Sequence, residues 1–178
     1  LAQLQEGGTK LHVTLDLTKE EDRDILKCLV GDADVLIETY PAGVMDEWGI
    51  GYDELAKINP RLIYTSLSAY GSFGPESGRR QYDYDNVSQA RSGIQYGTGE
   101  ILPEGKTYQE MPYACPTKAG PWIAWAASGC FGAMGILSAL YHRGVTGEGQ
   151  AIDIATPEAY ERLHDYALHW YADQGILN

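Results

Sequence analysis

The chain has 178 residues, which is enough for one domain with a sizeable core. Its 13 lysines and arginines face 25 acids, a formal charge of −12, which argues against a nucleic-acid partner because phosphates require a basic face. The three cysteines form no Cys-x-x-Cys pair, so neither a disulfide framework nor a zinc site is indicated, and a cytoplasmic location is expected. Of the histidines, His164 and His169 have the closest spacing, which does not suit a metal site, and no metal is expected.

The first third of the chain predicts strands that alternate with helices. Residues 12–17 alternate between polar and apolar side chains and predict a strand. Thr18 and Glu21 form a capping-box pattern at the start of a helix expected over residues 18–30. The apolar run 33–38 is typical of a strand that is buried on both faces of a parallel sheet.

The loop at 39–43 follows this buried strand, at the end where open α/β sheets bind their ligands. Two short helices are expected at 45–48 and 52–58, and a third strand at 61–68. Strands joined by helical crossovers predict an α/β fold, a doubly wound, Rossmann-like sheet with flanking helices.

Residues 79–93 begin polar and predict a helix from about Asp85. Two Tyr-Asp pairs, at 82–83 and 84–85, are compatible with acid/base chemistry, but such pairs more often belong to a solvated surface or to helix caps. The 25 residues or so that follow are rich in Gly, Pro and Glu and predict a long connection.

Residues 116–143 form the most unusual stretch, since no charged side chain lies between Gly120 and His142. Glycine is costly inside a helix, so the spacing of Gly129, Gly132 and Gly135 predicts close approach of another backbone or a ligand. The stretch can be a buried core helix or the wall of an active site. A membrane span is a third possibility that the glycines and serines disfavour, and no membrane association is expected.

The chain then predicts a turn, a strand at 151–155 and a final helix. Thr156 is in position to cap this helix, with Pro157 at its first position.

Taken in order, these motifs resemble the class III CoA-transferases of the CaiB/BaiF type, a family that includes the acyl-CoA racemases. The resemblance covers nearly all of residues 11–160. It is carried by DLTKEEDRDILKCLVGDADVLIE, GVMDEWGIGYDELAKINPRLIYTSLSAYGSFGP, YDNVSQARSG, PTKAG, ASG and ILSALYHRGVTGEGQAIDIATPEA.

The resemblance implies that residues 1–178 are an internal fragment of the large CoA-transferase domain, without the first crossover unit and the C-terminal small domain. It also implies interlocked dimers, in which each chain is threaded through its partner. In the family's mechanism an aspartate attacks the thioester of the donor acyl-CoA to give a mixed anhydride. CoA thiolate opens the anhydride to an enzyme thioester, and the acceptor acid leaves as its CoA ester.

The family pattern locates this aspartate by its spacing from a proline and two glycines. Pro116, Gly120 and Gly129 match, and the nucleophile position holds Trp125. An indole N–H only donates hydrogen bonds, and it has no oxygen to acylate. The racemases carry a histidine base where this chain has Tyr84, so the resemblance leaves no catalytic residue retained.

For coenzyme A, the resemblance implies binding by residues of the loop after the buried strand and of the Tyr-Asp motif: Thr39, Tyr40, Trp48, Tyr84 and Asp85. Two departures weaken this site. Residues 38–43 read ETYPAG where the family commonly has Glu-Asn-Phe-Arg-Pro-Gly. Glu47 stands where an arginine is common, and an acid there would repel a phosphate.

Three functions follow as hypotheses. The chain is a CoA-transferase subunit, or half of a tandem enzyme, that has lost its nucleophile and works with a catalytic paralogue on an acyl-CoA and a carboxylic acid. Alternatively, it is an active transferase, for instance as a dimer of identical chains, that uses another residue, such as Glu110, Asp85 or one outside this fragment. The third is a binding or scaffold protein that holds no CoA.

Overall fold

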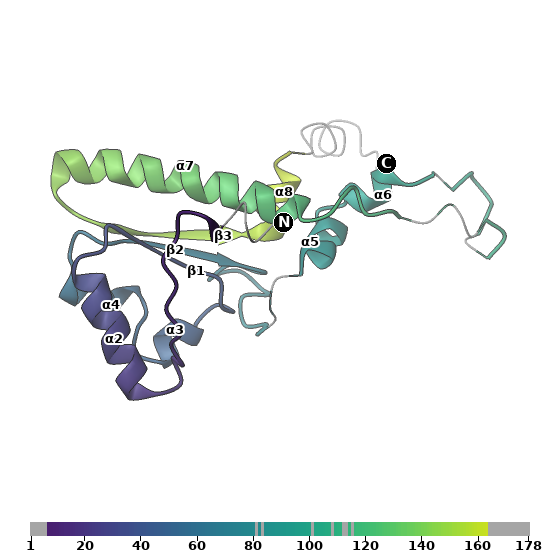
Figure 1. Cartoon of the computed structure of the whole chain (residues 1–178). Helices are drawn as coiled ribbons and strands as arrows, with labels where there is room; N and C mark the ends of the chain where they lie inside the picture. Colours follow the sequence, from purple (N-terminus) through teal and green to yellow (C-terminus); the bar gives the residue numbers. More distant parts are fainter. Residues whose placement is uncertain are drawn as a thin grey trace.

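A computed structural model describes residues 7–80, 82, 84–100, 102–107, 109–111, 114 and 116–163. Its centre is a sheet of three parallel strands in the order β1 (Val35–Glu38), β2 (Ile63–Ser68) and β3 (Gln150–Ala155). Helices cover both faces of the sheet, which confirms the predicted doubly wound α/β fold (Figure 1).

The helices divide between the two faces. Below the sheet in Figure 1 lie α2 (Glu20–Gly31), α3 (Val44–Glu47) and α4 (Tyr52–Ile58), and above it lies α7 (Ile123–Thr146). Three shorter helices stand near the carboxyl ends of the strands: α5 (Asp85–Arg91), α6 (Ile94–Thr98) and α8 (Thr156–Glu161). The described residues between α6 and α7 reach outward from the body of the molecule (Figure 1). They belong to the long connection that the sequence predicts, and we call them the outer segment.

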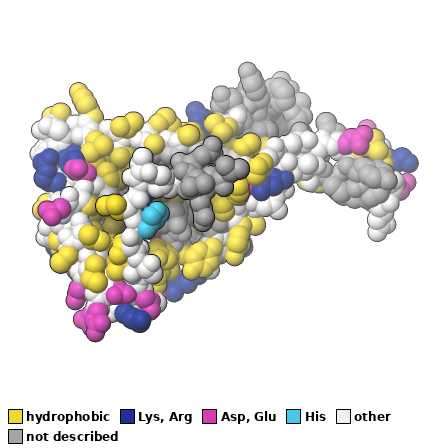
Figure 2. Space-filling view, viewed as in Figure 1, with side chains coloured by type: hydrophobic (Ala, Val, Ile, Leu, Met, Phe, Trp, Pro, Cys, Tyr) yellow, Lys and Arg dark blue, Asp and Glu magenta, His cyan; other side chains and the backbone are white. Residues whose placement is uncertain are grey.

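The strands send alternate side chains to the two faces. On one face, Tyr64 packs with Val30 of α2 and Leu55 of α4 in the main buried cluster. On the other, Thr65 and Leu67 lie beneath α7. The continuous apolar run of β2 is therefore explained by burial on both sides of the sheet. The prediction that residues 33–38 are buried on both faces is wrong, since Ile37 of β1 is 58% exposed. Figure 2 shows acidic side chains gathered at the lower tip of the molecule, where α2 begins with three acids.

Glycines let α7 approach the sheet closely. A Cβ added at Gly132 would lie 3.5 Å from Leu67 Cδ2, and one added at Gly135 would lie 3.2 Å from Ile152 Cγ2. The neighbours are side chains of the sheet and not the other backbone that the sequence predicts, and only the contact at Gly135 is tighter than ordinary packing. The prediction is wrong at Gly129, which has nothing within 4 Å.

Within the described part of the chain, α7 is the one helix with the length and apolar composition of a membrane span. On its inner side, Gly132 lies over Leu67 of the sheet, and Ala124 and Ala127 pack with Tyr160 of α8. The prediction of a buried core helix holds for this side alone, since Leu137 and Tyr141 on the outer side are 67% and 80% exposed.

The far end of α7 is tied to the starts of two strands by Arg143. Its guanidinium, 10% exposed, donates to Asp34 Oδ1 at 2.6 Å and to the carbonyl of Arg61 at 2.9 Å. The chain then returns to the sheet through Gly149, whose N–H donates to the carbonyl of Pro60 at 2.9 Å. A Cβ at Gly149 would overlap the backbone of Leu62, so β3 can approach β2 only with glycine here.

Two predictions near the N-terminus are wrong. Residues 12–17 pair with none of the three strands, and a strand requires a hydrogen-bonding neighbour. The helix begins at Glu20, because the Thr18 hydroxyl donates to Asp16 Oδ1 at 2.6 Å instead of capping it.

Thr156 also differs from expectation. It is the first residue of α8, its hydroxyl makes no capping bond, and this buried oxygen has no hydrogen-bond partner among the described residues.

Candidate functional site

A pocket of about 400 Å³ opens where the carboxyl ends of the three strands meet the first turns of α7. This volume is in the range of small-molecule sites, and the position is where open α/β sheets bind ligands. Six described residues line this strand-end pocket: Thr39, Leu67, Tyr82, Trp125, Ser128 and Thr156.

Trp125 lies on the first turn of α7 and is 42% exposed. Its indole lines the strand-end pocket and leaves the volume open, whereas complete burial is expected if the ring filled the site of a lost nucleophile. The carbonyl of Trp125 accepts a hydrogen bond from Ser128 Oγ at 3.0 Å, which fixes the local turn. Each described side chain that lines the pocket is uncharged.

The carboxylate of Asp85 lies beneath the start of α7 and is 4% exposed. Oδ1 accepts from the backbone N–H of Ala124 at 2.9 Å and of Trp125 at 3.3 Å, and Oδ2 accepts from that of Trp122 at 3.1 Å. The first N–H groups of a helix have no partner within the helix and favour a negative charge. Asp85 therefore acts as the N-terminal cap of α7 from a distant part of the chain.

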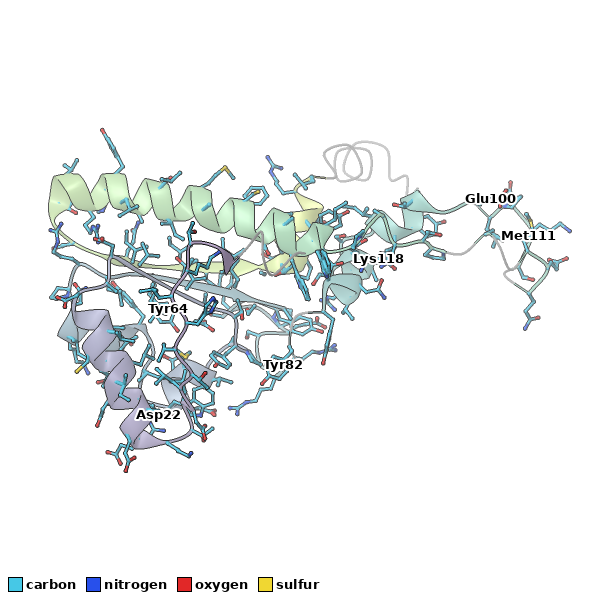
Figure 3. The ribbon with its side chains drawn as sticks, viewed as in Figure 1. Asp22, Tyr64, Tyr82, Glu100, Met111 and Lys118 are labelled. Atoms are coloured by element: carbon cyan, nitrogen blue, oxygen red, sulfur yellow. The ribbon has the colours of Figure 1, made fainter. Side chains whose placement is uncertain are left out.

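Two side chains complete the surroundings of Asp85. Gln89 Nε2 donates to Oδ2 at 2.7 Å, and Lys118 Nζ lies 2.9 Å from the same oxygen. Burial acts to raise the pKa of Asp85, but the hydrogen bonds from Lys118, Gln89 and the backbone outweigh it and hold this pKa below its ordinary value. Figure 3 shows Lys118 where the outer segment joins the body of the molecule. In all, five donors surround the carboxylate of Asp85.

The other predicted CoA-binding residues are dispersed. Thr39 joins Trp125 in the strand-end pocket. Tyr84 precedes α5 and is 56% exposed. Tyr40 and Trp48 form an edge-to-face pair with ring centroids 5.2 Å apart, packed against the core cluster on the α2 face. The structure thus brings Thr39 and Trp125 into one pocket and leaves Tyr40 and Trp48 outside it. Asp85 lies outside the described lining and contacts the backbone N–H of Trp125.

Glu110, the other carboxylate considered as a nucleophile, lies on the outer segment after α6. Its Oε2 accepts from the backbone N–H of Thr107 at 3.0 Å, and its Oε1 lies 3.5 Å from Lys106 Nζ. It is absent from the described lining of the strand-end pocket.

A second cavity, of about 180 Å³, lies on the opposite face of the sheet and contains Glu38, Asp46, Asp153 and Tyr64. Burial and the charges of Asp153 and Asp46 raise the pKa of Glu38, against hydrogen bonds from Ser66 and the Tyr40 N–H. The pKa of Tyr64 is also raised, by burial and by the charges of Glu38 and Asp46 (Tyr64 is labelled in Figure 3).

Among the described side chains, no group of three or more His, Cys, Asp or Glu is arranged to hold a metal ion. His164 and His169 lie outside the described residues.

Glu47 is paired with Arg80, which follows β2 in the chain. Arg80 Nη1 donates to Glu47 Oε2 at 2.9 Å, and Nη2 donates to Oε1. The charge expected to repel a phosphate is therefore matched by a guanidinium. Charge and spacing in the sequence give no signal for this contact, because its partners are 33 residues apart.

Sequence reasoning assigned no binding role to four residues of the described pocket lining: Leu67, Tyr82, Ser128 and Thr156. Thr156 directly follows β3, so the rule that ligands bind at strand ends could have identified it. Tyr82 precedes α5, in a segment that the sequence leaves without a place in the fold (Figure 3). Ser128 lies one turn after Trp125 on α7, and the helical period could have grouped the two.

Comparison with known proteins identifies relatives of this chain in sequence and in structure. The chain is 37% identical over 172 residues to the succinyl-CoA–L-malate CoA-transferase beta subunit of Chloroflexus aurantiacus, covering 96% of this chain and 39% of the relative. It is 43% identical over 167 residues to the acetyl-CoA:oxalate CoA-transferase of Acetobacter aceti, covering 93% and 40%. The crystal structure of a CaiB/BaiF family protein from Brucella suis superposes with a TM-score of 0.78 at 31% identity, covering 93% of this chain and 40% of that one.

The chain thus spans about 40% of the length of the curated relatives that it matches. The sequence pattern of CoA-transferase family III matches residues 3–177, nearly the whole chain. The chain belongs to CoA-transferase family III.

Proposed function

We propose that this chain is part of a class III CoA-transferase that moves CoA between an acyl-CoA and a carboxylic acid in the cytoplasm, and that it serves as the non-catalytic partner. A paralogue with an aspartate at the position of Trp125 supplies the nucleophile, either as a separate subunit or as the second half of a tandem enzyme. The two family members form the interlocked dimer that the resemblance implies.

The observation that carries the proposal is the lining of the strand-end pocket. Trp125 lies on its wall, and no described residue of that wall bears a carboxylate. Asp85, the carboxylate that lies beneath Trp125, holds the first turn of α7 and has its oxygens occupied by five donors. Covalent transfer through an anhydride requires a carboxylate that can reach the thioester.

The relatives support a partner of the same family. The alpha and the beta subunit of the succinyl-CoA–L-malate CoA-transferase of Chloroflexus aurantiacus are 39% and 37% identical to this chain. By their names, that enzyme has an alpha and a beta subunit, and each of the two is similar in sequence to this chain.

The test compares the full-length protein alone with the protein co-purified with its paralogue. Acyl transfer from acetyl-CoA or succinyl-CoA to a panel of carboxylic acids is followed by chromatography of the CoA esters. We expect no transfer by the protein alone and transfer by the pair. Robust transfer by the pure protein would sink the proposal.

Trapping identifies the reacting chain directly. Hydroxylamine added during turnover attacks the carbonyl of the enzyme thioester, releases CoA and leaves a hydroxamate on the reacting side chain, which mass spectrometry of the peptides locates. We expect the label on the paralogue alone. A hydroxamate on Asp85 or Glu110 of this chain would instead support an active transferase with a relocated nucleophile.

A further inference from the structure

Resting on the proposed function, we infer that the strand-end pocket selects acyl-CoA thioesters whose acyl group is uncharged and apolar, such as an aryl or branched alkyl group. The acyl group lies against the indole of Trp125. Thioesters that carry a second, free carboxylate are rejected.

The first step of the inference concerns charge. The side chains of Thr39, Tyr82 and Ser128 offer hydroxyl groups, Trp125 offers an indole N–H, and Leu67 is apolar. No lysine or arginine belongs to the described lining. A carboxylate moved from water into such a site stays unpaired, and an unpaired buried charge is strongly unfavourable.

The second step concerns three basic side chains outside the described lining of the pocket. Lys118 is held by Asp85, and Arg80 is held by Glu47. Arg91 is paired with Glu76 and lies over the ring of Tyr70, with its guanidinium carbon 4.8 Å from the ring centroid. Each of these cations already has an acid beside it, so a ligand carboxylate would have to compete with that acid for the cation.

The third step concerns shape and surface. Trp125 is 42% exposed and Tyr82 is 60% exposed, so both rings offer open aromatic surface to a ligand. Aromatic side chains bind flat apolar groups by burying large area and by offset or edge-to-face contacts. Behind them, the buried hydroxyl of Thr156 has no partner among the described residues.

Binding to the full-length protein, without acceptor acid, tests the inference by calorimetry. The probes are phenylacetyl-CoA, isovaleryl-CoA, succinyl-CoA and CoA itself, which share the nucleotide and differ in the acyl group. We expect the two apolar thioesters to bind at least about tenfold more tightly than succinyl-CoA, because the free carboxylate loses its hydration without gaining a cation. Equal or tighter binding of succinyl-CoA, or no binding of any thioester, would overturn the inference.

Variants locate the selectivity. W125A should lower affinity for phenylacetyl-CoA by about tenfold and leave affinity for CoA nearly unchanged, and W125F should fall between. T39K adds a cation at an exposed lining position and should narrow the preference for phenylacetyl-CoA over succinyl-CoA. S138K adds the same charge on α7, about 20 Å along the helix from Trp125. This variant should leave the ratio of the affinities for phenylacetyl-CoA and succinyl-CoA unchanged.

A ratio that T39K and S138K shift equally would contradict a local origin. These outcomes are separate from the test of the proposed function, which measures turnover. A protein that transfers CoA by itself while still preferring apolar thioesters refutes the non-catalytic role and keeps the inference. A protein that is inactive alone and binds succinyl-CoA more tightly supports the non-catalytic role and refutes the inference.

Discussion

The carboxylate of Asp85 accepts a hydrogen bond of 2.9 Å from the backbone N–H of Ala124, 39 residues later in the chain. An amide in its place keeps one acceptor oxygen but turns N–H groups towards the N–H groups of α7. We expect D85N to lower the free energy of unfolding by about 2 to 3 kcal/mol, measured by urea denaturation. D53N, at an exposed carboxylate of α4, is the matched control and should stay within about 0.5 kcal/mol of wild type. Equal stability of the two variants would contradict the capping role.

The pH dependence of this difference has a fixed sign. Because the pKa of Asp85 is lower in the folded protein, its ionised form contributes stability above the ordinary value of 3.8. That contribution is lost as the pH falls through the folded pKa. The gap in unfolding free energy between wild type and D85N should therefore be widest near neutral pH and shrink below pH 3.8.

Glu38 should show the opposite trend. Its pKa is raised in the folded protein, so its contribution is fully present below the ordinary value of 4.5 and is lost as the pH rises through the folded pKa. We expect E38Q to be more stable than wild type at pH 7, with the difference vanishing below pH 4.5. Thermal unfolding across this range measures the effect. E54Q, at an exposed acid of α4, is the control, and a loss of stability in E38Q at pH 7 would refute the expectation.

Gly149, directly before β3, and Gly144, in the last turn of α7, give a pair of matched predictions. A methyl group at Gly149 would overlap the backbone of Leu62, whereas nothing lies within 4 Å of one at Gly144. We expect G149A to lower the free energy of unfolding by about 2 kcal/mol or more through overpacking. G144A, inside α7, should raise it by up to about 1 kcal/mol. Chemical denaturation of both variants checks the pair, and similar effects at the two sites would show that β3 does not need this close approach.

The guanidinium of Arg143 donates to both Asp34 and the carbonyl of Arg61, and a lysine can reproduce only part of this geometry. We expect R143K to lower the free energy of unfolding by about 1 to 2 kcal/mol, with hydrogen exchange faster at the amides of β1. R162K, at an exposed arginine of the described chain, should have little effect. Unchanged exchange in R143K would show that this contact does not hold the end of α7 to the sheet.

Much of the fold could be predicted from local pattern. The runs at 33–38, 61–68 and 151–155 all became parallel strands, because their apolar and β-branched composition leaves a local signal. Burial on both faces holds for β2, whereas Ile37 of β1 is largely exposed and β3 has no buried residue. The strand at 12–17 was wrong because alternation says nothing about whether a neighbouring strand is available to pair. Thr18 failed as a cap because Asp16, two residues earlier, competes for its hydroxyl.

The site was less predictable. The position of Thr39 after β1 followed from the strand-end rule, and Trp125 followed from family spacing. The contact of Asp85 with the first turn of α7 joins residues about 40 positions apart, and the pairing of Glu47 with Arg80 joins residues 33 apart. Only the three-dimensional path of the chain brings such groups together.

The pairing of Glu47 with Arg80 makes the two positions interdependent. A guanidinium introduced at position 47 alone would face that of Arg80 at hydrogen-bonding range, and an acid introduced at position 80 alone would face Glu47. Each single reversal sets like charges against each other, whereas the double exchange restores attraction. An arginine at position 47 therefore suits this loop only together with an acid at position 80, so the charges of the two segments are set jointly.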